Sequence, residues 1–114
     1  METMMEKQNH LLQALHTPRG LSFGTWQMIP GRNVSRALCC HGYDWVLIDT
    51  EHGNIDDKAM HEAVAAVASM GKQSPIVRVA AAEGWMIKRM VAAPGCYILH
   101  YQGIMGNEYN SCYQ

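Results

Sequence analysis

The sequence lacks an excess of charge of either sign. Its 114 residues contain 9 Lys and Arg against 10 Asp and Glu, which gives a formal net charge of -1. Domains that bind nucleic acid or anionic membranes usually carry a basic patch. The charge balance therefore predicts small molecules or other protein chains as partners, and neither nucleic acid nor a membrane.

Long apolar runs and regularly spaced cysteines are missing as well. No window of about 18 apolar residues is present for a membrane span, and residues 1–16 contain no apolar segment of the secretory type. The four cysteines include one adjacent pair and no C-x-x-C spacing, so they indicate neither a disulfide framework nor a zinc site. We therefore expect a cytoplasmic protein with reduced thiols.

What the sequence does contain is alternating helical and strand periodicity, with 48% apolar residues to build a core. The run WVLI is continuous and apolar, as expected for a strand covered on both faces of a parallel sheet. Strands that alternate with helices predict right-handed crossovers and an α/β fold. The predicted elements are a helix at 4–16, a strand at 21–28, a helix from 33 to a cap at Gly42, a strand at 45–48, a helix from an N-cap at 54–57 to Gly71, a strand at 75–79, a helix at 83–91 and a candidate strand at 97–101.

Each predicted helix after the first strand carries an apolar stripe that we expect to be buried. Beyond residue 93 the periodicity is lost, and we expect an irregular tail there. The stripe residues are Val34, Ala37 and Leu38; Met60, Ala63, Val64, Val67 and Ala68; and Ile87, Met90 and Val91.

Polar residues stand at the ends of the predicted strands, where parallel α/β folds place their sites. Asp49 and His52 follow the strongest strand, and a carboxylate there needs a partner or a role. In one interpretation Asp49 orients His52, which acts as a general base. In the other, Asp49 caps the following loop and His52 satisfies it. The orientation of Glu51 stays open, because a turn breaks the strand alternation.

Arg78 lies inside the apolar run PIVRV, where a guanidinium is rarely found without an anion to meet. Its fixed set of donors suits a substrate carboxylate or a developing enolate oxygen. A salt bridge to Asp49 or Glu51 is an equally good interpretation, and both can hold in one site.

Three segments, FGTWQMIPGRNVSRAL, GYDWVLIDTEHGNIDD and PIVRVAAAEGWMIKR, resemble the opening units of the HpcH/HpaI aldolase family. The resemblance covers about residues 21–89. It implies a (β/α)8 barrel and a metal-dependent lyase that cleaves 4-hydroxy-2-oxo acids to pyruvate and an aldehyde. By position, His52 matches the catalytic base, Asp49 the residue that orients it, Arg78 the group that stabilises the enolate oxygen, and Trp26 a wall of the substrate pocket.

The sequence also departs from this family. The family's divalent metal, Mg²⁺, Mn²⁺ or Co²⁺, is held by a glutamate and an aspartate from later strands, and no residue here can be assigned to them. Ala92 and Ala93 stand where the family has an aspartate-glycine step. The sequence therefore predicts a truncated barrel of three to four βα units, with a leading helix at 1–20, the partial barrel at 21–93 and a divergent tail at 94–114.

The resemblance and the missing metal ligands leave two alternative functions for this chain. The first is a carbon–carbon lyase acting on a small 2-oxo acid. The second is a non-catalytic, shortened relative that serves as an interaction subunit or is a nonfunctional fragment. An open parallel sheet leaves an unpaired edge strand and an exposed apolar face, which favours a homo-oligomer or aggregation.

Overall fold

The computed structural model describes residues 10–18, 20–81, 83–90, 97–100 and 103–105. The predicted leading helix is therefore seen only from His10 onward. Val91, which is predicted to belong to a buried stripe, lies outside the described residues, as do Cys96 and Cys112.

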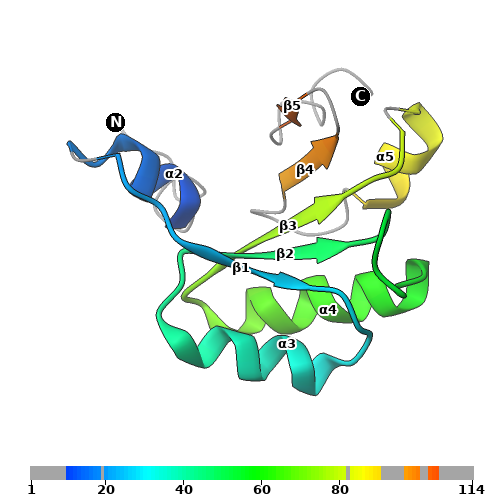
Figure 1. The fold of residues 1–114 in the computed structure, drawn as a ribbon, viewed down its shortest axis with the longest axis horizontal. Helices are drawn as coiled ribbons and strands as arrows, with labels where there is room; N and C mark the ends of the chain where they lie inside the picture. Colours follow the sequence, from blue (N-terminus) through cyan, green and yellow to red (C-terminus); the bar gives the residue numbers. More distant parts are fainter. Residues whose placement is uncertain (1–9, 19, 82, 91–96, 101–102, 106–114) are drawn as a thin grey trace.

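The described chain is an α/β structure built on one sheet (Figure 1). Strands β1 to β4 are parallel, each hydrogen-bonded to the next along the chain, and β5 runs antiparallel to β4. The predicted alternation and parallel sheet are confirmed. The elements are α2 (His10–His16), β1 (Gly24–Gln27), α3 (Arg32–Leu38), the short 3-10 helix η1 (Cys39–His41), β2 (Trp45–Asp49), α4 (Asp57–Met70), β3 (Ser74–Arg78), α5 (Gly84–Met90), β4 (Tyr97–His100) and β5 (Gly103–Met105).

The beginning and end of the longest helix, α4, follow from local sequence signals. Asp56 is the N-cap, and its side chain accepts a hydrogen bond of 2.8 Å from the backbone N–H of Ala59. Gly71 ends the helix with φ of 70°, and Gly42 ends η1 with φ of 69°. Both glycines adopt the left-handed conformation that favours this residue at C-caps, as predicted. The helix predicted to reach Gly42 is divided, however, because α3 ends at Leu38 with Cys39 as its C-cap, and η1 follows.

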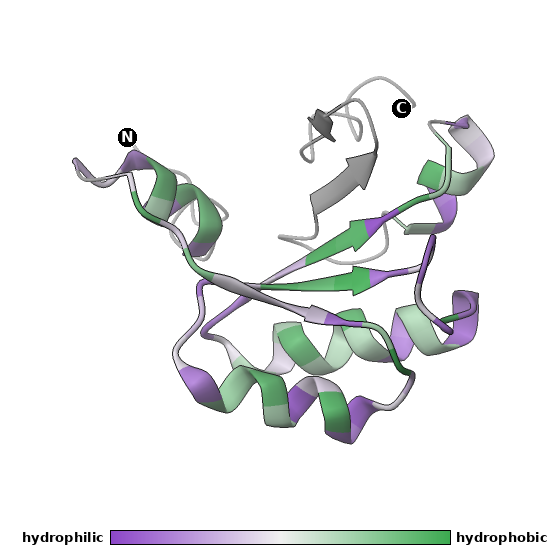
Figure 2. Cartoon of the chain, viewed as in Figure 1, coloured by the Kyte–Doolittle hydropathy of each residue, from purple (hydrophilic) through white to green (hydrophobic). Residues whose placement is uncertain are grey.

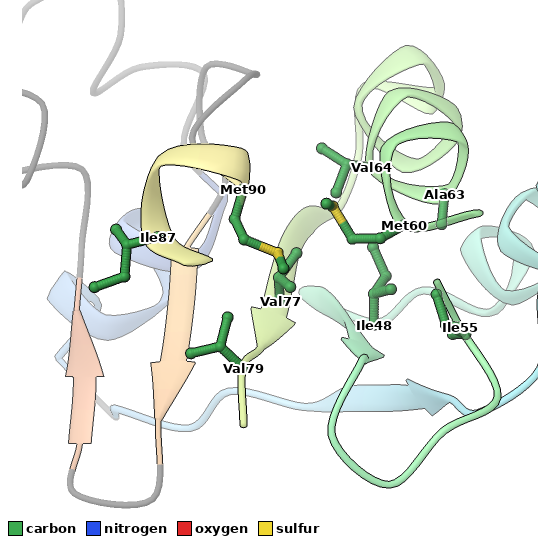
Figure 3. Close-up of a cluster of buried hydrophobic side chains, with 9 residues drawn as sticks. All are labelled: Ile48, Ile55, Met60, Ala63, Val64, Val77, Val79, Ile87 and Met90. Atoms are coloured by element: carbon green, nitrogen blue, oxygen red, sulfur yellow. The ribbon is translucent and has the colours of Figure 1, made fainter. Parts of the chain in front are cut away.

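The main core lies between the sheet and its covering helices. Helices α3 and α4 lie side by side under one face of the sheet in Figure 1, and α5 lies near the carboxyl end of β3. In Figure 3, Ile48 from β2 lies beside Met60 of α4, and Val77 from β3 lies beside Met90 of α5. Side chains alternate between faces along a strand, so β2 and β3 direct every second residue into this core.

Two of the predicted helix stripes need correction. Ala68 is exposed and Ala66 is buried instead; α4 contacts α3 as well as β2 and β3, so its buried face is wider than a stripe against the sheet alone. In α3, Ala37 is exposed and Ser35 is fully buried. The Ser35 hydroxyl donates to Gln27 Oε1 at 2.8 Å, so this helix is joined to β1 through a buried polar pair.

The opposite face of the sheet is covered at the amino ends of the strands by α2. Leu11 packs there against Leu47 and Ile76, and its N–H donates to the Ser74 hydroxyl at 3.1 Å. None of the described helices combines the length and the apolar character that a bilayer crossing requires.

The last strand differs from the sequence expectation. The segment Gly103–Met105, which was expected to be irregular, forms β5 and pairs with β4 through the register Leu99↔Ile104. The tail is therefore partly ordered as an antiparallel pair. The predicted truncation of the chain stays a prediction.

Candidate functional site

Three neighbouring strands bring polar side chains to the same edge of the sheet. The register pairs Trp26 with Leu47 and Asp49 with Arg78. Because of strand alternation, Trp26, Asp49 and Arg78 share the face opposite to the α4 core. In Figure 2, the middle parts of β2 and β3 are hydrophobic, and both strands turn hydrophilic near their carboxyl ends.

Asp49 is the centre of this group. It is fully buried, and both of its carboxylate oxygens accept hydrogen bonds. Arg78 donates from Nε to Oδ1 at 3.0 Å and from Nη2 to Oδ2, and Trp26 Nε1 donates to Oδ2 at 3.0 Å. The Arg78 guanidinium carbon also lies 5.2 Å from the centre of the Trp26 ring, within the range of a cation–π contact.

The same carboxylate holds the loop that follows β2. Oδ1 accepts the backbone N–H of Glu51 at 3.1 Å and that of His52 at 3.0 Å. Burial raises the pKa of Asp49, but the hydrogen bonds from Arg78, the two backbone N–H groups and Trp26 outweigh it and hold that pKa well below its usual range. The hydrogen bond to Asp49 in turn raises the pKa of Arg78. Asp49 is therefore an ionised anchor and not a proton acceptor near neutral pH.

Gly53 lets this loop pass close over the strand ends. A Cβ at this position would lie 2.2 Å from the Asp49 carbonyl oxygen and 3.0 Å from that of Met28. The next residue, Asn54, donates its N–H to the Met28 carbonyl at 2.9 Å. Only glycine fits this approach, which fixes the path of the chain immediately after His52.

His52 faces solvent beside this group. Its side chain is 64% exposed, and Nε2 lies 3.0 Å from Glu51 Oε1. The other carboxylate oxygen of Glu51 lies 3.8 Å from Arg78 Nε. The imidazole therefore contacts Glu51 and is linked through it to Arg78.

The predicted pairing of Asp49 with the His52 imidazole is wrong. Asp49 points inward from a buried strand and its oxygens are occupied, whereas His52 lies beyond the turn, so only the His52 backbone reaches Asp49. The alternative, in which Asp49 caps the loop, is confirmed, and so is the salt bridge of Arg78 to Asp49. The partner of the His52 imidazole is Glu51, which the sequence did not predict. The turn signal T-E-H-G could have pointed to it, since neighbouring residues on a turn can meet.

The catalytic roles that the resemblance implies for His52, Asp49 and Arg78, and the pocket role of Trp26, stay predictions. The described residues also do not fit a divalent metal by themselves. In this part of the chain, no three His, Cys, Asp or Glu side chains are grouped closely enough to hold one. Asp49 is already occupied by Arg78 and Trp26.

A pocket of about 170 Å³ lies on the other face of the strand ends, against α5. Its lining combines core residues such as Val79 and Met90 with the polar groups of Thr50, Asp57 and Arg89. Arg89 is paired with Asp57 at 3.0 Å. The pocket does not include Asp49, His52 or Arg78, so the polar group of the strand ends is separate from it.

Comparison with known proteins places this geometry in a family context. No protein-family model matches the chain. A hydroxypyruvate/pyruvate aldolase from Paraburkholderia phytofirmans is 38% identical over 72 residues, which cover 62% of this chain and 28% of the relative. A 2-dehydro-3,6-dideoxy-6-sulfogluconate aldolase from Pseudomonas putida is 39% identical over 66 residues, covering 58% and 26%.

Solved structures of known proteins also match part of this chain. An HpcH/HpaI aldolase/citrate lyase family protein from Burkholderia cenocepacia matches with a TM-score of 0.67 and 33% identity, over 75% of this chain and 34% of that one. The resemblance to the HpcH/HpaI aldolase family is confirmed. Macrophomate synthase is a further structural neighbour, with a TM-score of 0.62 and 28% identity over 75% of this chain and 30% of that one. The similarity is to the N-terminal part of these proteins, and the chain spans less than a third of the length of the curated relatives that it matches first.

Proposed function

We propose that this chain carries part of the active site of a carbon–carbon lyase that acts on small 2-oxo acids. One observation carries the proposal. Trp26, Asp49 and Arg78 form one bonded group at the carboxyl ends of three adjoining parallel strands, beside an exposed histidine, in a chain similar to pyruvate aldolases. Sites of parallel β/α folds lie at this edge.

The fold that accompanies this function is the opening of a (β/α)8 barrel. Each of the first four strands lies beside the next one in sequence, which is the neighbour order of a barrel. The antiparallel pairing of β5 with β4 departs from that order. The proposed barrel-like part therefore extends from β1 to β4.

Arg78 is suited to bind the substrate oxygen. A guanidinium has five N–H donors, and Asp49 accepts two of them, which leaves three for a ligand. The buried carboxylate fixes the plane of the guanidinium, and the Arg78 side chain is 22% exposed. A fixed donor set can stabilise charge on an enolate oxygen without reorganising during the reaction.

His52 is suited to move the proton. In cleavage of a 4-hydroxy-2-oxo acid, a base removes the proton of the 4-hydroxyl group, the bond between C3 and C4 breaks, and the aldehyde leaves. The electron pair of that bond forms the enolate of pyruvate, whose oxygen Arg78 binds, and the proton returns to C3. The His52 imidazole is exposed to a ligand, whereas the lowered pKa of Asp49 keeps that carboxylate ionised and bonded.

A cleavage assay tests this proposal. The full chain is incubated with a 4-hydroxy-2-oxo acid, with and without an added divalent cation, and pyruvate release is measured. We expect His52→Ala to lower turnover by about 10²- to 10⁴-fold, the usual contribution of a positioned base. His61→Ala, which removes an exposed histidine of α4, is the matched control and should leave turnover unchanged. Absence of pyruvate release by the wild type, or equal release by wild type and His52→Ala, would reject the proposal.

A second candidate function, an interaction subunit, is favoured by the surface around β1. In the described sheet β1 is an edge strand that pairs only with β2. The residues flanking it include large apolar side chains that are mostly exposed, Leu21, Phe23 and Ile29. Such an edge can pair with a second copy of the chain, and we propose a homo-oligomer as the form that this function takes.

Size-exclusion chromatography with light scattering tests the second candidate. We expect a mass above that of one chain, and a return to one chain when Ile29→Lys places a charge beside the edge. Leu15→Lys, at an exposed position of α2, is the control. A wild type that runs as a single chain at micromolar concentration would count against this function.

A further inference from the structure

Glu51 lies between the His52 imidazole and the Arg78 guanidinium of the candidate site. Its Oε1 is 3.0 Å from His52 Nε2, and its Oε2 is 3.8 Å from Arg78 Nε. The Glu51 side chain is only 23% exposed, compared with 64% for His52. Neither the resemblance nor the comparisons assign this glutamate a role.

The backbone fixes Glu51 in this place. Its N–H donates to Asp49 Oδ1 at 3.1 Å, next to the bond from the His52 N–H to the same oxygen. Asp49 thus sets the turn on which both residues stand. Its oxygens are filled by Arg78, Trp26 and these N–H groups, so the carboxylate that reaches the imidazole is that of Glu51.

We propose that Glu51 is the positioning residue of His52: it holds Nε2 and leaves Nδ1 as the nitrogen that receives the proton. An imidazole nitrogen that faces a carboxylate keeps its hydrogen, and the lone pair of the neutral ring is then on the other nitrogen. Among the described residues, no contact to Nδ1 competes with a ligand. The catalytic part of this inference rests on the proposed function, whereas the contact itself does not.

The tautomer of His52 gives a test that needs no turnover. Two-bond ¹H–¹⁵N spectra of the full chain, with signals assigned by His52→Ala, report which ring nitrogen carries the hydrogen in the neutral form. We expect the Nε2–H form in the wild type and a mixture of both forms in Glu51→Ala. Glu51→Gln should keep the wild-type form, because the amide oxygen still accepts a hydrogen bond.

The matched control is Glu62→Ala, which removes a glutamate of α4 that is paired with Arg32 at 3.8 Å and should not change the His52 signals. Circular dichroism checks that each variant keeps its helix content. An Nδ1–H form in the wild type, or the same spectrum in wild type and Glu51→Ala, would overturn the proposal.

The pyruvate assay separates this inference from the proposed function. In an active wild type, Glu51→Ala should lower kcat about 10²-fold, at the low end of the contribution of a positioned base, with little change in KM, and Glu51→Gln should recover most of the loss. An unchanged kcat in Glu51→Ala would overturn the positioning role while leaving the lyase function standing. An inactive wild type with the expected tautomers would reject the function and support the positioning contact.

Discussion

The two ends of the loop between β2 and α4 carry aspartates that do similar work in different surroundings. Asp49, at the strand end, is fully buried and accepts five hydrogen bonds, from Arg78, Trp26 and two backbone N–H groups. Asp56, at the helix start, is exposed and accepts one, from Ala59. Both carboxylates cap backbone N–H groups, so burial and the number of partners are what distinguish them.

This difference shows how one segment serves both the fold and the site. A buried carboxylate is costly unless it is paired and hydrogen-bonded, so Asp49 requires Arg78 for structural reasons. The same pairing orients the guanidinium that we assign to the substrate oxygen. An exposed cap such as Asp56 carries no such requirement, because water replaces whatever bond is lost.

The largest effect is expected from Asp49→Ala. The substitution leaves the Arg78 guanidinium without its buried anion, with only Glu51 at 3.8 Å, and removes the acceptor of two loop N–H groups. Breaking a buried pair by removing one partner costs about 3–5 kcal/mol, and we expect a loss of this size in the free energy of unfolding, measured by urea denaturation. Asp49→Asn keeps an acceptor oxygen for the loop and should lose less. A loss below about 1 kcal/mol for Asp49→Ala would show that the pair does not stabilise the fold.

Acid should remove part of the same contribution. The folded-state pKa of Asp49 is lowered, so below the ordinary carboxyl pKa of about 3.9 the unfolded chain binds a proton that the folded chain does not. The stability that Asp49 supplies is therefore complete above about pH 4 and is lost as the pH falls below it. Denaturation of wild type and Asp49→Asn between pH 7 and 3 should show a difference in the free energy of unfolding that narrows as the pH falls below 4. A constant difference down to pH 3 would contradict the lowered pKa.

The loop also shows where sequence reasoning succeeds and where it fails. The run WVLI, the cap Asp56 and the terminating Gly71 are local signals, and each predicts its element because its cause lies within a few residues. The partner of the His52 imidazole depends on the turn that ends the strand alternation, so the period of the sequence does not say which carboxylate, that of Asp49 or that of Glu51, it meets. Ser35 is buried for a similar reason, because its partner Gln27 belongs to another element.

A smaller effect is expected from Gly53→Ala, which tests the path of the loop between the two aspartates. The new Cβ would lie 2.2 Å from the Asp49 carbonyl oxygen, so the backbone must shift. Overpacking of this kind costs about 1–3 kcal/mol, to be measured by urea denaturation, and the His52 signals should move because the next residue is displaced. Asn54→Ala, at an exposed neighbouring position, should stay within about 0.5 kcal/mol of wild type. Equal stability of Gly53→Ala and Asn54→Ala would contradict the close approach.

The smallest loss of stability is expected from Asp56→Ala. The size of this loss decides whether Asp49 and Asp56 differ through burial and pairing or act only as caps. Loss of an N-cap side chain costs about 1 kcal/mol, because one exposed hydrogen bond to Ala59 is replaced by a bond to water. Asp56→Ser should recover most of this loss, since a hydroxyl also caps the helix, and urea denaturation of both variants measures it. If Asp56→Ala were as destabilising as Asp49→Ala, capping alone would explain both aspartates, and the buried pair with Arg78 would have no separate part in the fold.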